Sequence, residues 1–224
     1  MTEERYIRNL GALSEEESAL LREKTVLVAG CGALGGYLIE MLLRLGVGEI
    51  RAADGDRFEA SNLNRQLLSS PALLGKGKAE AAAERAAAVN PDVRFIAVPE
   101  FVTEENAATL IRGCDAVLDA LDSVDSRLLL AKACTEEKIP LIHGAICGWN
   151  AQAAIVLPGD GLMERIYPEC AAVESKASLS FTPAFCAALQ TALCVRLLTG
   201  RKVESGKLYV ADLLDMKMES LLLG

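Results

Sequence analysis

A glycine-rich turn between two apolar segments constrains the fold of this chain more than any other feature. Residues 25–29 are apolar and mostly β-branched, which predicts a buried parallel strand. Glycines at 30, 32 and 35 then form the pattern G-x-G-x-x-G, and residues 33–45 have helical periodicity up to Gly46. A second strand is predicted at residues 50–53, with Asp54 at its end. This order is typical of a nucleotide-binding βαβ unit.

The chemistry of such a unit explains each part. Glycines permit a tight bend and let the backbone approach a phosphate, and the helix N-terminus, here Ala33, offers free N–H groups. Asp54 follows Gly35 at close to the separation of about 20 residues at which an acid binds the ribose. The alternative is that the glycines serve only helix–strand packing.

The segment after Asp54 is not explained by a dinucleotide site. It contains Asp56, the run Ser61-Asn-Leu-Asn-Arg65-Gln66, and Lys78 in the first turn of a predicted alanine-rich helix. A lysine there opposes the helix dipole unless an anion lies nearby. Arginine binds phosphates with two parallel hydrogen bonds, and lysine adds a point charge. These residues therefore indicate a triphosphate.

Together these motifs resemble the HesA/MoeB/ThiF family, relatives of the ubiquitin-activating enzymes. The resemblance is carried by the glycine turn, Asp54-Gly-Asp56, Ser61–Gln66, Lys78 and Arg5-Tyr-Ile-Arg8. It implies an adenylyltransferase that uses ATP and Mg²⁺. Its substrate would be the C-terminal glycine carboxylate of a small ubiquitin-like or sulfur-carrier protein with a Gly-Gly tail, as in thiamine or molybdopterin biosynthesis. The products would be a carrier acyl-adenylate and pyrophosphate.

The resemblance also implies roles for individual residues. Arg8, Arg65 and Lys78 would neutralise the phosphates, and Asp122 would place Mg²⁺ through ATP. Asp122 has a second interpretation as a helix N-cap, a role that Ser123 or Asp125 would fill equally well. Arg8 would act in its own subunit or in the neighbouring subunit of a homodimer. The expected nucleotide-binding residues are Gly30, Gly32, Ala33, Gly35, Asp54, Asp56, Asn62, Asn64, Arg65, Lys78, Asp122 and Ser123.

Other functions remain open at this point. Within the family, the chain could resemble a tRNA threonylcarbamoyladenosine dehydratase, although the net charge of −8 weighs against nucleic-acid binding. A nucleotide-binding regulatory module with little catalysis is a second alternative. An NAD-dependent oxidoreductase is the third, but it leaves Arg65 and Lys78 unexplained.

Composition and periodicity predict the architecture. At 224 residues and 51% hydrophobic content, the chain is long and apolar enough for one packed domain, residues 1–224. Strands alternate with helices over residues 25–145, which predicts an α/β fold with a Rossmann-like, mainly parallel sheet and helices on both faces. A helical arm precedes it at 1–24. Residues 146–224 continue the sheet with antiparallel strands and are expected to bind the carrier.

Several local predictions accompany this outline. Ser14 and Glu17 form a capping-box pattern, and Thr103 and Thr182 are expected to cap helices that run to residues 112 and 198. The last of these helices is apolar almost all round, which predicts burial. No segment is expected to span a membrane, and no apolar signal segment stands at the N-terminus, so a cytoplasmic location is expected.

The cysteines do not suggest a metal site. The seven cysteines form no C-x-x-C pair, the C-terminal tail has none, and His143 is the one histidine. Relatives often carry a Cys₄ zinc site, which this chain is therefore expected to lack. Whether Cys170 accepts the carrier or sulfur stays open. His143 is expected to have a structural role.

Overall fold

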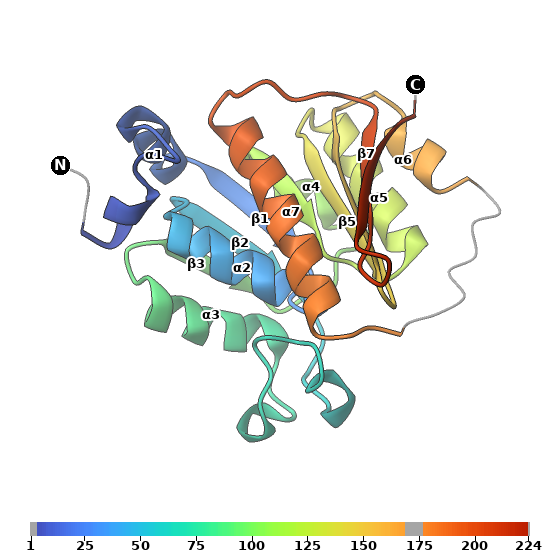
Figure 1. Ribbon diagram of the computed structural model, residues 1–224. Coiled ribbons are helices and arrows are strands. Elements are labelled where there is room, and N and C mark those ends of the chain that lie inside the picture. Colours follow the sequence, from blue (N-terminus) through green and yellow to red (C-terminus); the bar gives the residue numbers. More distant parts are fainter. Residues whose placement is uncertain (1–3, 169–176, 224) are drawn as a thin grey trace.

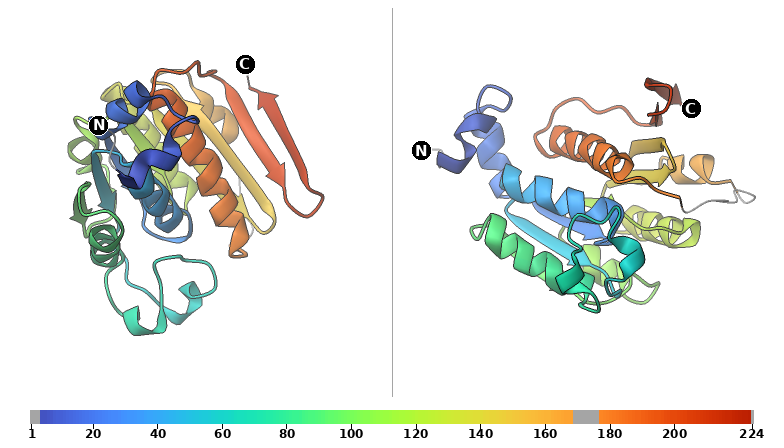
Figure 2. Two further views of the ribbon diagram at one scale, coloured as in Figure 1. Left: turned by 60° about the vertical axis from the view of Figure 1, so that its left-hand side comes forward. Right: turned by 60° about the horizontal axis from the view of Figure 1, so that its bottom comes forward.

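The computed structural model describes residues 4–168 and 177–223. These residues form an eight-stranded sheet with helices packed on it (Figure 1). Its order is β3-β2-β1-β4-β5-β6-β7-β8. The first five strands pair in parallel: β1 (Thr25–Ala29), β2 (Glu49–Ala53), β3 (Arg94–Val98), β4 (Ala116–Asp119) and β5 (Leu141–Cys147). The last three pair in antiparallel fashion: β6 (Asn150–Val156), β7 (Lys207–Asp212) and β8 (Lys217–Leu222). Figure 2 shows β7 and β8 as a hairpin at the edge of the sheet.

Helices cover both faces of the sheet. One core joins Val26 and Val28 of β1 to α2 (Ala33–Leu45), α3 (Lys78–Val89) and α7 (Phe181–Leu198). The other joins Leu27 and Ala29 to α4 (Ala107–Ile111), α5 (Val124–Glu136) and α6 (Leu162–Ile166). Alternate residues of β1 thus enter opposite cores because successive side chains of a strand point to opposite faces. The predicted fold class is confirmed.

Short elements connect and precede these layers. The N-terminal arm consists of the 3₁₀ helix η1 (Glu4–Asn9) and α1 (Glu15–Arg22), and two further 3₁₀ turns, η2 (Ala60–Asn62) and η3 (Pro71–Leu73), lie between β2 and α3. The predicted capping box at α1 is present, with reciprocal bonds between Ser14 and Glu17. Helix α2 ends at Gly46, whose φ of 79° is the left-handed conformation that glycine adopts without strain.

Two predicted helix caps are wrong. Helix α4 begins at Ala107 after Asn106, whose side-chain oxygen accepts from the backbone N–H of Thr103, so a turn replaces the first helical residues. Helix α7 begins at Phe181, and Ser180 holds the cap position. Thr182 lies inside the helix, where its hydroxyl donates to the carbonyl of Gly148 at 2.8 Å. At α4 a local turn therefore replaces the predicted cap, whereas at α7 a contact with a residue distant in the chain replaces it.

Helix α7 corrects a second expectation. No segment was expected to be long and apolar enough to cross a membrane. The 18 residues of α7 meet that condition by length and composition, because Arg196 is their one charged residue. Half of the helix is buried in the fold, where it packs against α2, β5 and β6 (Figure 1). A helix that is apolar on nearly all sides is stable when it is packed inside a protein core. The contacts of α7 with α2, β5 and β6 agree with the predicted burial.

Candidate active site

A pocket of about 220 Å³ lies at the carboxyl ends of the parallel strands. It is bounded by the turns after β1, β2 and β4 and by the N-terminus of α3. The strand order reverses between β1 and β4, and open α/β sheets bind ligands at such a switch point. The predicted residues that line the pocket are Gly30, Gly32, Ala33, Asp54, Asp56, Arg65, Lys78 and Asp122.

The three glycines of the turn have different roles. Gly30 has a φ of 101°, and a Cβ there would meet the carbonyl oxygen of Ala120 at 2.7 Å. A Cβ on Gly35 would lie 1.8 Å from the carbonyl oxygen of Gly30, so Gly35 serves the packing of α2 on the turn. Gly32 stands at the N-cap of α2, where a Cβ would meet nothing closer than Gln66 at 3.6 Å. Gly32 therefore keeps the helix N-terminus accessible from the pocket.

Asp54 is fixed under the glycine turn. Its carboxylate accepts from the backbone N–H of Cys31 at 2.7 Å and from that of Asp56 at 2.8 Å. The first bond joins the end of β2 to the turn after β1, although the two residues are far apart in the chain. Asp54 thus presents an oriented carboxylate at the pocket wall, as a ribose site requires.

Two of the predicted cationic side chains, Lys78 and Arg65, border the pocket. The Lys78 Nζ lies 2.8 Å from Asp56, and its side chain is 8% exposed whereas that of Asp56 is 59% exposed. Arg65 donates from Nη1 to the carbonyl of Ser61 at 2.8 Å and to the side chain of Asn64 at 2.9 Å. Both positive charges therefore have defined positions at the pocket.

Three other predicted residues lie outside the pocket wall. The buried Asn62 accepts from the backbone N–H of Glu59, the N-cap of η2, and Asn64 donates to the carbonyl of Ser178. Ser123 is the N-cap of α5 and accepts from the backbone N–H of Ser126. The cap that the sequence assigned equally to Asp122, Ser123 or Asp125 thus belongs to Ser123, and Asp122 lines the pocket.

Arg8 lies far from the pocket of its own chain. It belongs to η1, whose Tyr6 packs against Gly46 at the C-terminal end of α2 and accepts from Asn90 just after α3. The pocket is at the opposite, N-terminal ends of these two helices. Since α2 has 13 residues, its ends are about 20 Å apart.

A shallow groove adjoins the pocket. It encloses about 530 Å³ and shares Arg65, Ala177 and Ser178 with the pocket. Its remaining lining residues are Ser61, Asn64, Gly148, Trp149 and Leu179. Trp149 contacts Phe181 with ring centroids 5.0 Å apart, and both rings are partly exposed. An apolar, aromatic edge therefore leads toward Arg65.

Comparison with known sequences decides the family, because the ThiF family profile matches residues 5–224. This chain belongs to the ThiF family. It is 33% identical to the SAMP-activating enzyme E1 of Haloferax volcanii, over 97% of this chain and 84% of that protein. It is 34% identical to the sulfur carrier protein ThiS adenylyltransferase of Bacillus subtilis, over 82% of this chain and 57% of that protein. A sulfur carrier protein adenylyltransferase of Thermus thermophilus is 37% identical, over 68% of this chain and 57% of that protein.

These names agree with the expected enzyme class, an adenylyltransferase. The match spans little more than half of the Bacillus and Thermus enzymes. Among solved structures, E. coli MccB superposes with a TM-score of 0.87 at 21% identity, over 100% of this chain and 70% of MccB. At that identity the likeness shows a shared fold.

Sequence reasoning missed Phe101 and Arg127, which line the pocket of this ThiF-family protein. Gln66 also lines it; this residue belongs to the run that indicated a triphosphate but was not among the expected nucleotide-binding residues. The ring of Phe101 lies over Gly55, where a Cβ would come within 2.7 Å of it, yet the ring is 61% exposed. An aromatic residue just after a predicted strand at this edge of the sheet was the available signal for Phe101. Arg127 sits on a helix whose sequence gives no such signal.

The residues present fit ATP. The Oε1 of Gln66 is buried in the pocket wall without a hydrogen-bond partner among the described residues, so the wall offers an acceptor to a polar ligand. The turn glycines and the two cations suit phosphates. The carboxylates of Asp56 and Asp122 also line the pocket and suit a hard cation that takes its other oxygens from phosphate and water.

Proposed function

We propose that this protein uses ATP to adenylylate the C-terminal glycine carboxylate of a small ubiquitin-like or sulfur-carrier protein. The observation that carries the proposal is the position of Arg65, which borders both the nucleotide pocket and the adjoining groove. A peptide tail lying in the groove would bring its terminal carboxylate to Arg65 and to the phosphates. The relatives named as sulfur-carrier adenylyltransferases support the same reaction.

In the proposed reaction a carboxylate oxygen bonds to the α-phosphorus while the bond from that phosphorus to the bridging oxygen breaks. Pyrophosphate leaves, and the carrier acyl-adenylate remains. Two anions must meet, so the enzyme contributes neutralising charge and alignment. Arg65 and Lys78 would neutralise the phosphates, and Asp54 would bind the ribose. Mg²⁺, held by Asp122 and the phosphates, would supply further positive charge.

Arg8 completes the site from a second copy of the chain under this proposal. The arm that carries Arg8 is anchored at the far ends of α2 and α3, where Asn90 donates to Tyr6 at 2.7 Å. An arginine there reaches phosphates only in another subunit, which implies a homodimer. Mixing Arg8→Ala protein with Arg65→Ala protein should then restore part of the activity, because a mixed dimer contains one intact site. No recovery after subunit exchange would contradict the shared site.

The reaction is tested by ATP–pyrophosphate exchange with a panel of small carriers that end in Gly-Gly, each with and without that tail. Exchange that requires one carrier and its tail supports the proposal and identifies the partner. Nucleotide binding without exchange for any carrier contradicts it. A second panel of tRNA and small acids then distinguishes a dehydratase-like activator from a regulatory module.

The remaining expectations are part of the proposal. We place residues 1–224 in one ThiF-type domain in the cytoplasm, without a zinc site. One zinc per chain by metal analysis of purified protein would contradict the last point. Cys170, the residue left open as an acceptor, lies outside the described residues.

A further inference from the structure

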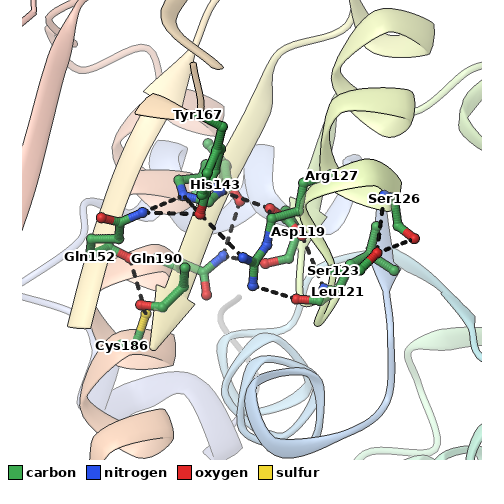
Figure 3. Close-up of polar contacts among 12 residues, drawn as sticks. Asp119, Leu121, Ser123, Ser126, Arg127, His143, Gln152, Tyr167, Cys186 and Gln190 are labelled. Atoms are coloured by element: carbon green, nitrogen blue, oxygen red, sulfur yellow. Dashed lines mark hydrogen bonds and ion pairs between the residues drawn. The ribbon is translucent and has the colours of Figure 1, made fainter. Parts of the chain in front are cut away.

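Five polar side chains from different elements form a buried network at the pocket wall, and one of them, Arg127, also lines the pocket (Figure 3). They are Asp119 at the end of β4, Arg127 on α5, His143 on β5, Gln152 on β6 and Tyr167 just after α6. Asp119 and His143 are fully buried, and Arg127 is 6% exposed. Burying charged groups costs free energy unless they are paired. The question is therefore which groups in this network pair with one another.

Hydrogen bonds link these side chains to one another. The Nδ1 of His143 donates to Asp119 Oδ2 at 2.7 Å, because a carboxylate only accepts. Its Nε2 then faces two donors, the side-chain amide of Gln152 at 3.2 Å and the Tyr167 hydroxyl at 3.3 Å. The Tyr167 oxygen accepts from Arg127 Nη1 at 3.2 Å and from Gln152 at 3.1 Å. The carboxylate of Asp119 and the guanidinium of Arg127 lie 3.5 Å apart and balance each other's charge.

The two charged members act on the same residue of the pocket wall. Asp119 Oδ1 accepts from the backbone N–H of Leu121 at 3.0 Å, and Arg127 Nη2 donates to the carbonyl of Leu121 at 2.6 Å. Leu121 directly precedes Asp122, and Ser123 begins α5. Both backbone polar groups next to Asp122 are therefore held by one ion pair, which restricts where its carboxylate can lie.

We infer that Asp119 and Arg127 are positioning residues that set Asp122 at the pocket, and that His143 and Tyr167 fix this ion pair from behind. The catalytic part of this inference rests on the proposed function. A buried ion pair adds little stability compared with apolar packing, so a positioning role accounts better for an ion pair that holds the backbone of Leu121 in the pocket wall. Small displacements of an aligned catalytic group reduce reaction rates strongly. Residues that hold Asp122 in place would therefore increase the rate.

Hydrogen–deuterium exchange of the nucleotide-free protein tests the positioning itself. In Arg127→Gln protein, the peptide over residues 120–124 should exchange about tenfold faster, since a charge-assisted bond that holds the turn is lost. Tyr167→Phe, which removes one hydroxyl, should raise the same exchange less. Arg112→Gln, an exposed arginine paired with Glu137, and Thr191→Val, a buried polar side chain on α7, are the controls.

These controls should leave the exchange of residues 120–124 unchanged. Unchanged exchange in both folded network variants, Arg127→Gln and Tyr167→Phe, would overturn the inference. Should Arg127→Gln fail to fold, Tyr167→Phe decides alone, with unchanged exchange overturning the inference and faster exchange supporting it.

A double-mutant cycle tests the route through Asp122. Arg127→Gln should lower kcat for pyrophosphate exchange by about tenfold or more, and it should change the KM for ATP less than about threefold. In an Asp122→Asn background it should cause no further loss, because its effect passes through that carboxylate. Losses that multiply would overturn the inference, as would a rise in KM alone, which marks a direct contact with the nucleotide. Wild-type protein without exchange for any carrier would refute the proposed function, while the deuterium experiment still decides the positioning.

Discussion

The ammonium group of Lys78 lies 2.8 Å from the carboxylate of Asp56, at the first residue of α3. The backbone N–H of Lys78 also donates to the carbonyl of Asp56 at 2.9 Å. A cation at a helix N-terminus is disfavoured by the helix dipole, and the side chain is nearly buried. Asp56 therefore compensates the positive charge of Lys78. An anionic ligand bound beside Lys78 would explain why a lysine occupies this position.

Replacement of this lysine should separate activity from stability. Lys78→Met should reduce pyrophosphate exchange by about 10²–10³-fold, the usual effect of removing one group that stabilises developing charge. The thermal midpoint should change little, because Asp56 is exposed enough to be solvated without its partner. Lys76→Met is the matched control, since Lys76 pairs with Glu84 away from the pocket lining. Equal losses in both variants would contradict a phosphate-binding role for Lys78.

The turn glycines should differ in what their replacement damages. Gly35→Ala should destabilise the fold by about 1–3 kcal/mol, the usual effect of overpacking, because its methyl group would collide with the carbonyl of Gly30. Gly32→Ala should fold with a loss of about 1 kcal/mol or less and instead raise the KM for ATP, since its methyl group faces the pocket. Denaturant unfolding and exchange kinetics on both variants measure the two effects. A stable Gly35→Ala protein would show that the turn is not tightly packed.

The N-terminal arm is joined to the segment after α7 by an ion pair between Glu17 and Arg201, and the stability that this pair contributes should depend on pH. Arg201 donates to both carboxylate oxygens of Glu17, and these bonds, with one from the backbone N–H of Ser14, lower the pKa of Glu17 from 4.5 to about 2. A folded-state pKa below the unfolded value contributes stability above the unfolded pKa. This contribution is lost as the pH falls from about 4.5 toward about 2. The difference in thermal midpoint between wild type and Glu17→Gln should therefore be present at neutral pH and shrink over that window.

Arg201→Gln should give the same pH profile as Glu17→Gln, because either substitution breaks the pair. Thermal melts across the acid range measure both. A midpoint difference that persists undiminished at the acid end of the window would show that Glu17 stabilises the arm by packing rather than by charge.

Cysteine reactivity should follow burial. Burial raises the pKa of Cys114 to about 11 and that of Cys134, Cys186 and Cys194 to about 12, and it also raises the pKa of Cys31 well above its ordinary value. Cys147 is exposed. In native protein at mildly alkaline pH, iodoacetamide should therefore modify Cys147 well before these five thiols, because the thiolate is the reactive form. Peptide mass spectrometry measures the order, with labelling in urea as the control. Rapid native labelling of Cys31 would show that the glycine turn opens.

Local patterns in the sequence predicted most of the framework. The strand, glycine turn and helix of residues 25–45, the acid at Asp54 and the lysine that begins α3 are all where their patterns indicate. The cap at Thr182 failed because its hydroxyl bonds to Gly148, which is distant in the chain. The cap at Thr103 failed because a local turn, closed by Asn106, takes the place of the first helical residues. Hydrophobic periodicity reports which elements form, but it does not report which side chain finds which partner.

The sequence by itself determined the order of elements, the edge of the sheet where the pocket lies, and the family. These depend on short-range periodicity and on motifs whose residues are close in the chain. Only the tertiary structure decided that Arg8 lies away from its own pocket, that Gly35 serves packing, and that Asp119, Arg127 and His143 meet behind Asp122. Those contacts join β4, β5 and α5, and they form only when the strand order brings separate segments together.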